Sequence, residues 1–235
     1  MGFLGMMVSD QYGGSGLDTL SYAIAIEEVS AGCASTGAIM SVNNSLVCSP
    51  LEKFANEEQK KKYLLPLAKG KKIGCFALSE PANGSDAAAL RTIAKRDGNS
   101  YILNGTKNFI TNGKEAEVCI LFATLDPTKG NKGITAFILE KGMPGFTVGK
   151  LEDKLGITAS STAQMHLENV KVPVANRLGE EGQGFKIALS TLDGGRIGIA
   201  AQALGIASAA LEASKKFARE REAFGVPIAK LQGIQ

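Results

Sequence analysis

The spacing of apolar residues changes twice along this chain of 235 residues, and no single motif constrains the fold as strongly. Over residues 17–69 apolar side chains recur every three or four positions, which is typical of amphipathic helices. One helical face is expected to carry Leu20, Ala23, Ile24, Glu27 and Glu28. Breaks are expected at Gly32, Asn43-Asn44 and Pro50, and residues 59–67 are expected to form the last helix of this layer.

Between residues 73 and 172 the pattern becomes short apolar alternations separated by turn residues, which indicates an all-β domain. Strands are expected at residues 73–78, 118–124 and 134–139. Asn104-Gly105 and Asn112-Gly113 are strong signals for a hairpin or a bulge, and Gly98-Asn99 is a weaker one.

The helical spacing returns at Gly184 and predicts a long bundle helix. Its apolar face is expected to hold Ile197, Ala200, Leu204, Ala207, Leu211 and Ala218. Because this face is rich in small residues, a neighbouring backbone could approach closely. The order predicts an α+β protein with an N-terminal helical layer (1–72), a central all-β domain (73–182) and an incomplete C-terminal helical bundle (183–235). Residues 1–7 resemble an interior segment and residues 225–235 the start of another helical element, so truncation at both ends is expected.

Charge and cysteine content narrow the possible functions. A formal net charge of +3, with charges of both signs interspersed, does not indicate a nucleic-acid or membrane-surface partner. The four cysteines form no C-x-x-C pair and the single histidine cannot complete a zinc site, so no metal site is expected and a reducing compartment fits. His166 is interpreted as a surface or hydrogen-bonded strand residue, and the lysines of 60–62 and 69–72 as solvated helix ends. No secretory leader and no membrane-spanning apolar stretch are expected.

The run from Ala77 to Asp86, ALSEPANGSD, joins an apolar strand to a turn rich in hydroxyl and amide groups. Pro81 withholds a ladder hydrogen bond where the turn begins, and Gly84 permits a positive φ or a close backbone approach. Such a turn can set backbone N–H groups against a flat, polar-edged or phosphorylated ligand. Rossmann and Walker phosphate loops and a serine nucleophile elbow are missing from the sequence, which disfavours those sites.

Several segments are similar to those of the acyl-CoA dehydrogenase family, in matching order and spacing along the whole chain. They are residues 12–18, 77–86, 104–113, 152–157, 178–185 and 219–225. Residues 39–46 and 192–200 most resemble the short-chain, butyryl-CoA branch. The resemblance implies an FAD cofactor contacted by Phe76, Ala77, Leu78, Ser79, Ser85, Phe109, Ile110 and Thr111. It also implies that the FAD of a neighbouring subunit is reached by Arg221, Ala223, Phe224 and Gln232.

The same resemblance implies roles for individual side chains. Ser85, Asp193 and Arg196 are implied near the acyl-CoA substrate, and the Thr111 hydroxyl near flavin N5. Phe109 stands where many relatives carry Trp. Without the resemblance, Ser79, Ser85 and Thr111 would be ordinary turn residues, and Asp193 and Arg196 a helix-start carboxylate and a surface arginine.

The implied reaction is α,β-dehydrogenation of a short-chain fatty acyl-CoA to the trans-2-enoyl-CoA, with electrons passed to electron-transfer flavoprotein. A carboxylate must remove the α-proton. In short-chain relatives this glutamate lies beyond residue 235, and other branches place it at the position of Gly195. No catalytic residue is therefore assigned, Glu80 does not inherit the role, and this chain alone is expected to be inactive. A homotetramer is implied, in the cytoplasm of a bacterium or the mitochondrial matrix of a eukaryote.

Two alternatives remain open. The missing base and the half bundle are also compatible with a noncatalytic protein that binds flavin or acyl-CoA. An acyl-CoA oxidase shares much of the scaffold, and oxygen consumption would distinguish it from a dehydrogenase.

Overall fold

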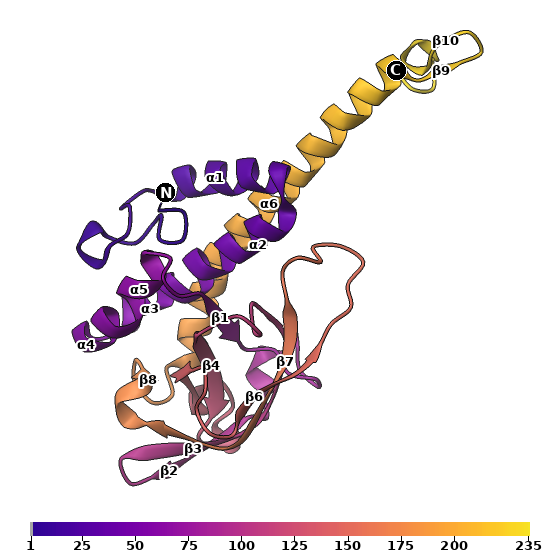
Figure 1. Ribbon diagram of the computed structural model, residues 1–235. Helices are drawn as coiled ribbons and strands as arrows, with labels where there is room; N and C mark the ends of the chain where they lie inside the picture. Colours follow the sequence, from indigo (N-terminus) through magenta and orange to yellow (C-terminus); the bar gives the residue numbers. More distant parts are fainter. Residues whose placement is uncertain (1) are drawn as a thin grey trace.

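Helices form the N-terminal layer. In the computed structural model, which describes residues 2–235, η1 (Asp10–Tyr12) precedes α1 (Thr19–Gly32) (Figure 1). α1 begins where the Asp18 carboxylate accepts a hydrogen bond from the Ser21 amide at 2.8 Å. The layer continues through α2 (Ala34–Ser41), η2 (Val42–Cys48), α3 (Ser49–Phe54), α4 (Glu57–Gln59), η3 (Lys60–Leu64) and α5 (Leu65–Ala68).

One of the three predicted helix breaks is confirmed and two are wrong. α1 ends at Gly32, as predicted. The chain then passes Asn43-Asn44 and Pro50 in one helical run, because η2 is a wider, π-helical segment that buries both asparagines. Asn43 Oδ1 accepts a hydrogen bond from the Gly74 amide at 3.0 Å. The asparagine side chains therefore bond to other segments of the fold, where the sequence had suggested a local turn.

The predicted face of α1 is wrong. Leu20 and Ile24 are 68% and 53% exposed, whereas Tyr22 and Ile26 are fully buried. Tyr22 and Ile26 belong to a core cluster with Met40 of α2. Apolar residues at helical spacing occur on both stripes of this helix, and the positions of α2 and the C-terminal helix decide which stripe is covered.

An eight-stranded mixed sheet forms the centre of the chain. Its strands are β1 (Gly74–Ala77), β2 (Ile93–Asp97), β3 (Ser100–Thr111), β4 (Val118–Thr124), β5 (Ile134–Glu140), β6 (Phe146–Leu151), β7 (Thr162–Pro173) and β8 (Arg177–Leu178). The order is β6-β7-β3-β2-β4-β5-β8, and β1 pairs in parallel with β4. The predicted strands are confirmed, with 118–124 matching β4 from end to end.

Two cores meet on β4, because every residue of this strand is buried. Ile120 and Phe122 pack with the helical layer on one face. Cys119 and Leu121 pack on the other face, in a core shared with β3 and β7. A strand covered on both faces reads as an unbroken apolar run, and VCILFAT is such a run. The helices therefore cover one face of the sheet, and the sheet curls over the other.

The predicted signals mark a hairpin, a bulge and a turn, and the hairpin comes from the weaker signal. The weaker one, Gly98-Asn99, forms the two-residue hairpin between β2 and β3, with Asp97 paired to Ser100. Gly98 adopts φ +55°, which glycine tolerates well. Asn104-Gly105 is a bulge within β3, and Asn112-Gly113 lies in the longer turn before β4. The sequence cannot separate a hairpin from a bulge here because both use the same residue pairs.

The long helix α6 (Gly184–Glu220) is confirmed and forms the spine between the two layers (Figure 1). Its predicted apolar face is wrong, since Leu204 and Leu211 are more than half exposed. Most residues of the buried stripe are small, among them Gly198 and Gly205. A Cβ on Gly205 would lie 2.1 Å from the Glu27 carbonyl oxygen of α1. Close backbone contact therefore selects the glycine stripe, and the larger apolar residues face outward.

Beyond α6 the chain forms a small hairpin and then a short helical turn, which lies in the region where the start of another helical element is expected. The hairpin comprises β9 (Glu222–Ala223) and β10 (Val226–Pro227), followed by η7 (Ile228–Lys230). This tip projects away from the rest of the molecule (Figure 1).

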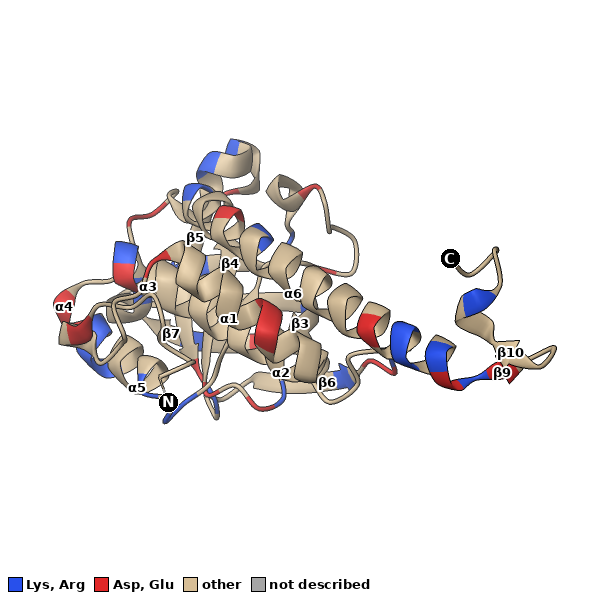
Figure 2. Ribbon diagram, turned by 90° about the horizontal axis from the view of Figure 1, so that it is seen from above, with Lys and Arg blue, Asp and Glu red and all other residues tan. Residues whose placement is uncertain are grey.

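The prediction that the chain has no apolar stretch able to span a membrane is wrong by length and composition. By these two measures α6 could cross a bilayer. Figure 2 shows few charged residues along the middle of α6 and several near its C-terminal end. A core helix of a soluble protein passes the same test, and the glycine stripe of α6 packs against α1, so the test is weak evidence for a membrane.

Gly205→Ala is expected to lower the free energy of unfolding by about 1–3 kcal/mol, because the new methyl group must push α1 away. Gly194→Ala on the same helix is the matched control, since its Cβ would meet nothing within 4 Å. It should raise stability by about 0.5–1 kcal/mol through helix propensity. Denaturant unfolding measures both, and equal effects at the two positions would contradict the close-contact model.

Candidate functional site

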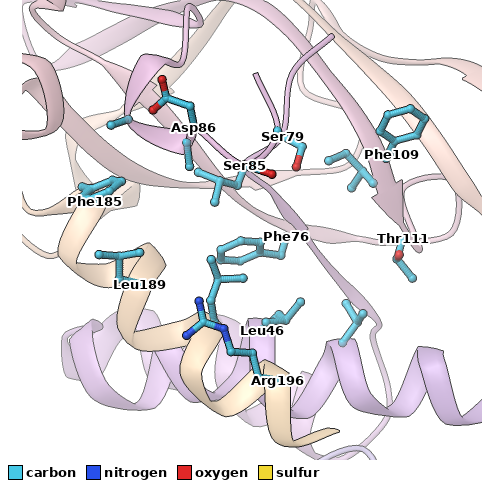
Figure 3. A pocket seen from close by; sticks show the side chains of 17 residues that line it. Leu46, Phe76, Ser79, Ser85, Asp86, Phe109, Thr111, Phe185, Leu189 and Arg196 are labelled. Carbon is cyan, nitrogen blue, oxygen red and sulfur yellow. The ribbon is translucent and has the colours of Figure 1, made fainter. Parts of the chain in front are cut away.

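A cavity of about 580 Å³ lies where the helical layer, the sheet and α6 meet. Figure 3 shows Phe76 of β1 near its centre, with Leu46 and Arg196 on the helical side. Thr111, at the end of β3, lies on the opposite side together with Phe109. The cavity is therefore built from five separate segments, which are η2, β1, the turn after β1, the end of β3 and the first half of α6.

Most of the predicted site residues meet at this cavity. Those that line it are Phe76, Leu78, Ser79, Ser85, Phe109, Ile110, Thr111 and Arg196. Ala77 does not, because alternation along β1 turns its side chain into the core on the other face of the sheet. Asp193 lines a neighbouring hollow with Lys132 and Lys186, and its carboxylate is 2.7 Å from the Arg196 guanidinium.

The remaining predicted residues lie far from the cavity in this chain. They are Arg221, Ala223, Phe224 and Gln232, at the tip beyond α6 (Figure 1). Phe224 is 94% exposed and adopts φ +54°. The four residues therefore lie apart from the cavity of their own chain, and their predicted contact with the FAD of a neighbouring subunit stays a prediction.

The turn after β1 is closed by hydrogen bonds at its base. The Glu80 and Asn83 backbones exchange two hydrogen bonds, of 2.9 and 3.1 Å. The Asn108 amide donates to the Ser79 carbonyl at 2.9 Å, which ties the turn to β3. β3 is irregular between Lys107 and Ile110, and Phe109 adopts φ +58° there with 62% of its surface exposed. This irregularity turns the Phe109 ring toward the cavity.

Beneath the turn lies a buried ion pair that the sequence analysis missed. Lys107 Nζ is 2.8 Å from Glu80 Oε1, and both side chains are at most 5% exposed. The Glu80 carboxylate also accepts hydrogen bonds from the Arg91 amide, the Thr92 amide and the Thr92 hydroxyl. Glu80 and Lys107 are 27 positions apart on different segments, so no local pattern pairs them.

Burial and pairing have opposite effects on these two groups. Burial favours the neutral form of Glu80, but the Lys107 charge and the hydrogen bonds outweigh it, so the pKa of Glu80 lies below its ordinary value. Burial lowers the pKa of Lys107, and the attraction of Glu80 only partly offsets this effect. The Glu80 carboxylate therefore stays ionised at neutral pH. Of the two groups, Lys107 is the one whose charged form is disfavoured by its surroundings.

Other chemistry-bearing residues lie outside the cavity. His166 is half-buried on β7, with Nδ1 3.3 Å from Thr106 Oγ1, which confirms its interpretation as a hydrogen-bonded strand residue. Lys60 and Lys62 pair with Glu57 and Glu140 at the helix end. Among residues 2–235 no three His, Cys, Asp or Glu side chains converge, so this part of the chain offers no candidate metal centre.

Three family models match consecutive parts of this chain. The acyl-CoA dehydrogenase N-terminal domain matches residues 1–71, the middle domain residues 75–170 and the C-terminal domain residues 182–235. The helical layer, mixed sheet and long helix follow the same order. The chain belongs to the acyl-CoA dehydrogenase family, which is FAD-dependent.

Within this family, the chain is similar to short-chain enzymes. It is 56% identical over 235 residues to the mitochondrial short-chain specific acyl-CoA dehydrogenase of Rattus norvegicus, covering 100% of this chain and 57% of that protein. The butyryl-CoA dehydrogenase structure from Megasphaera elsdenii matches with TM-score 0.96 and 51% identity, covering 99% of this chain and 62% of that one. A chain in a structure of the electron transferring flavoprotein of Acidaminococcus fermentans matches with TM-score 0.98 and 55% identity, covering 100% and 62%. The chain thus spans about three fifths of the length of these relatives.

Glu80→Gln is expected to lower the free energy of unfolding by about 3 kcal/mol at pH 7, because the Lys107 ammonium then lacks a counter-charge. Since the native pKa of Glu80 is lowered, its stabilisation is complete above the unfolded-state pKa of about 4.3. It is lost as pH falls through the native pKa, so the difference between wild type and variant should shrink in acid.

Denaturant unfolding across a pH series measures this difference. Glu212→Gln, in an exposed pair with Lys215, is the control and should change stability by less than about 0.5 kcal/mol. A difference for Glu80→Gln that stayed constant between neutral and strongly acid pH would contradict the ionised, buried pair.

Proposed function

We propose that the complete protein is an FAD-dependent dehydrogenase that converts a short-chain fatty acyl-CoA into the trans-2-enoyl-CoA. The observation that carries the proposal is the cavity between the layers, where Ser79 of the turn after β1 and Thr111 of β3 lie across from Arg196 of α6 (Figure 3). The identity of 56% to a short-chain specific dehydrogenase supports the substrate class.

The residues around the cavity suit an FAD. The rings of Phe76 and Phe109 offer flat surfaces to an aromatic ring system, and the hydroxyls of Ser79 and Thr111 offer hydrogen bonds at its polar edge. These donors would orient the ring and complement negative charge that gathers at that edge. When bound, FAD would supply the acceptance of a hydride from the substrate β-carbon. Ala77 would contribute through its backbone, since its side chain is in the core.

A second, apolar hollow adjoins the cavity and suits the acyl tail. It lies between η2 and α6 and shares Leu46, Leu192 and Arg196 with the cavity. Its remaining lining is apolar or small, including Gly195 and Ile199. We infer that the acyl chain occupies this hollow, and that Ser85, Asp193 and Arg196 lie near the polar parts of the acyl-CoA.

Removal of the substrate α-proton needs a base. Asp86 is the one acidic residue that lines the cavity in the described part of the chain, and its carboxylate points away from Phe76 in Figure 3. Gly195 lines the acyl hollow but has no side chain, and a Cβ there would meet Leu46 at 2.8 Å. We infer that the catalytic glutamate comes from outside this 235-residue chain, and that Asp86 does not replace it.

The exposed tip supports an assembly. Arg221, Ala223, Phe224 and Gln232 lie too far along α6 to serve the cavity of their own chain (Figure 1). We propose that they reach the FAD of a neighbouring subunit in a homotetramer, and that electrons leave to an electron-transfer flavoprotein. The compartment would be the cytoplasm in a bacterium or the mitochondrial matrix in a eukaryote.

The test is the visible absorption spectrum of the purified product of the complete reading frame, recorded before and after anaerobic addition of butyryl-CoA. We expect a yellow flavoprotein that bleaches, while the 235-residue chain alone shows no turnover. Flavin that never bleaches with acyl-CoAs of any length would indicate a noncatalytic binder. Rapid reoxidation with stoichiometric oxygen consumption would indicate an oxidase, and either result would overturn the dehydrogenase.

Arg196→Gln is expected to raise the KM for butyryl-CoA roughly tenfold, because a charged hydrogen-bond donor to the substrate is lost. The flavin spectrum should stay unchanged. Lys215→Gln, further along α6 and away from the cavity, is the control. An unchanged KM with an altered flavin spectrum would contradict substrate binding by Arg196 and would indicate that this residue contacts the cofactor.

A further inference from the structure

The Glu80–Lys107 pair lies where three parts of the cavity wall are held together. Lys107 Nζ donates to the Leu78 carbonyl at 3.1 Å as well as to Glu80 at 2.8 Å. Leu78 and Ser79 line the cavity directly above these contacts. The first wall segment is therefore fixed by a fully buried ammonium group.

The same carboxylate closes the loop that supplies the second wall segment. Glu80 stands at the start of this loop, and Arg91 and Thr92 stand at its end. Their amides donate to the carboxylate at 2.6 and 3.0 Å, and the Thr92 hydroxyl donates at 2.6 Å. Cavity residues 84–88 lie between these two ends. One side chain thus joins both ends of a loop whose middle faces the ligand.

Lys107 also stands immediately before the third wall segment. The register of β3 with β7 shifts between Lys107 and Ile110, and Phe109 adopts φ +58° within this irregular part of the strand. The neighbouring Asn108 amide donates to the Ser79 carbonyl. The irregular stretch that presents Phe109, Ile110 and Thr111 is therefore anchored to the first wall segment at its base.

We propose that Glu80 and Lys107 form a positioning pair that sets the geometry of the cofactor-facing wall and so determines flavin affinity. Neither Glu80 nor Lys107 lines the cavity, so the pair would act through Leu78, Ser79, the loop of residues 81–90 and Phe109. The proposal rests on the proposed function, because it assumes that the cavity holds FAD. A pair that served stability alone would need no hydrogen bonds to both the Leu78 carbonyl and the far end of the loop, directly before the stretch that presents Phe109.

The test compares Glu80→Gln, Lys107→Met and the double variant Glu80→Gln/Lys107→Met with wild type, in the complete protein. Three quantities are measured: the FAD dissociation constant, the thermal midpoint, and amide hydrogen exchange in peptides covering residues 78–92 and 105–111. The matched control is Asp97→Asn/Lys171→Met, which removes an exposed pair at 3.4 Å from the same sheet. The double variant keeps the proposal testable if a single variant, with one unpaired buried charge, fails to fold.

A positioning role predicts that stability and flavin affinity separate in the double variant. Its thermal midpoint should return toward that of wild type, because no unpaired charge remains buried. Its FAD dissociation constant should stay roughly ten- to a hundredfold higher, because the Leu78 carbonyl and the Arg91 and Thr92 amides have lost their charged partners. Those amides should also exchange faster than in the control.

Recovery of both quantities together, or wild-type FAD affinity in the single variants, would overturn the proposal. Failure of the proposed function is a different result, in which wild type itself takes up no FAD. In that case hydrogen exchange still tests whether the pair holds the loop. Unchanged exchange at the Arg91 and Thr92 amides in Glu80→Gln would show that it does not.

Discussion

The arrangement of this protein depends on one constraint, which is that β4 must be covered on both faces. Ile120 and Phe122 require helices on one side, and Cys119 and Leu121 require a curled sheet on the other. Helices packed on a sheet cannot also cover the ends of its strands. A cavity therefore remains where β1 and β3 end beneath α6, and the polar turns at those ends become its wall.

Burying a charge pair under that wall carries a cost that only complete pairing offsets. Lys107 has no exposed surface, and both its contacts are oxygen atoms of the turn after β1. The Glu80 carboxylate in turn accepts three hydrogen bonds from the far end of the loop. A loop bound by charged groups at its base has fewer alternative conformations than one held by apolar contacts, which suits a surface that must match a rigid ligand.

The positions of the helices and strands could be predicted from the sequence more accurately than which face of each helix is buried. β4 and the start of α6 at Gly184 follow from periodicity alone. The buried stripes of α1 and α6 were predicted wrongly, because apolar residues occur on more than one side of each helix. Gly205 shows the physical reason, since contact with the α1 backbone favours the smallest side chain over the most apolar one. The cavity residues Ser79 and Thr111 were predicted through the family resemblance, whereas Lys107 carries no local signal.

The sequence by itself determined the order of helices and strands, the β4 core strand and the membership of the acyl-CoA dehydrogenase family, because periodicity and motif spacing are local properties of a chain. The tertiary structure alone decided which turn became a hairpin, which helical stripe was buried, and that Glu80 would meet Lys107. These outcomes depend on contacts between residues far apart in the chain, and the sequence pattern of either partner does not contain them.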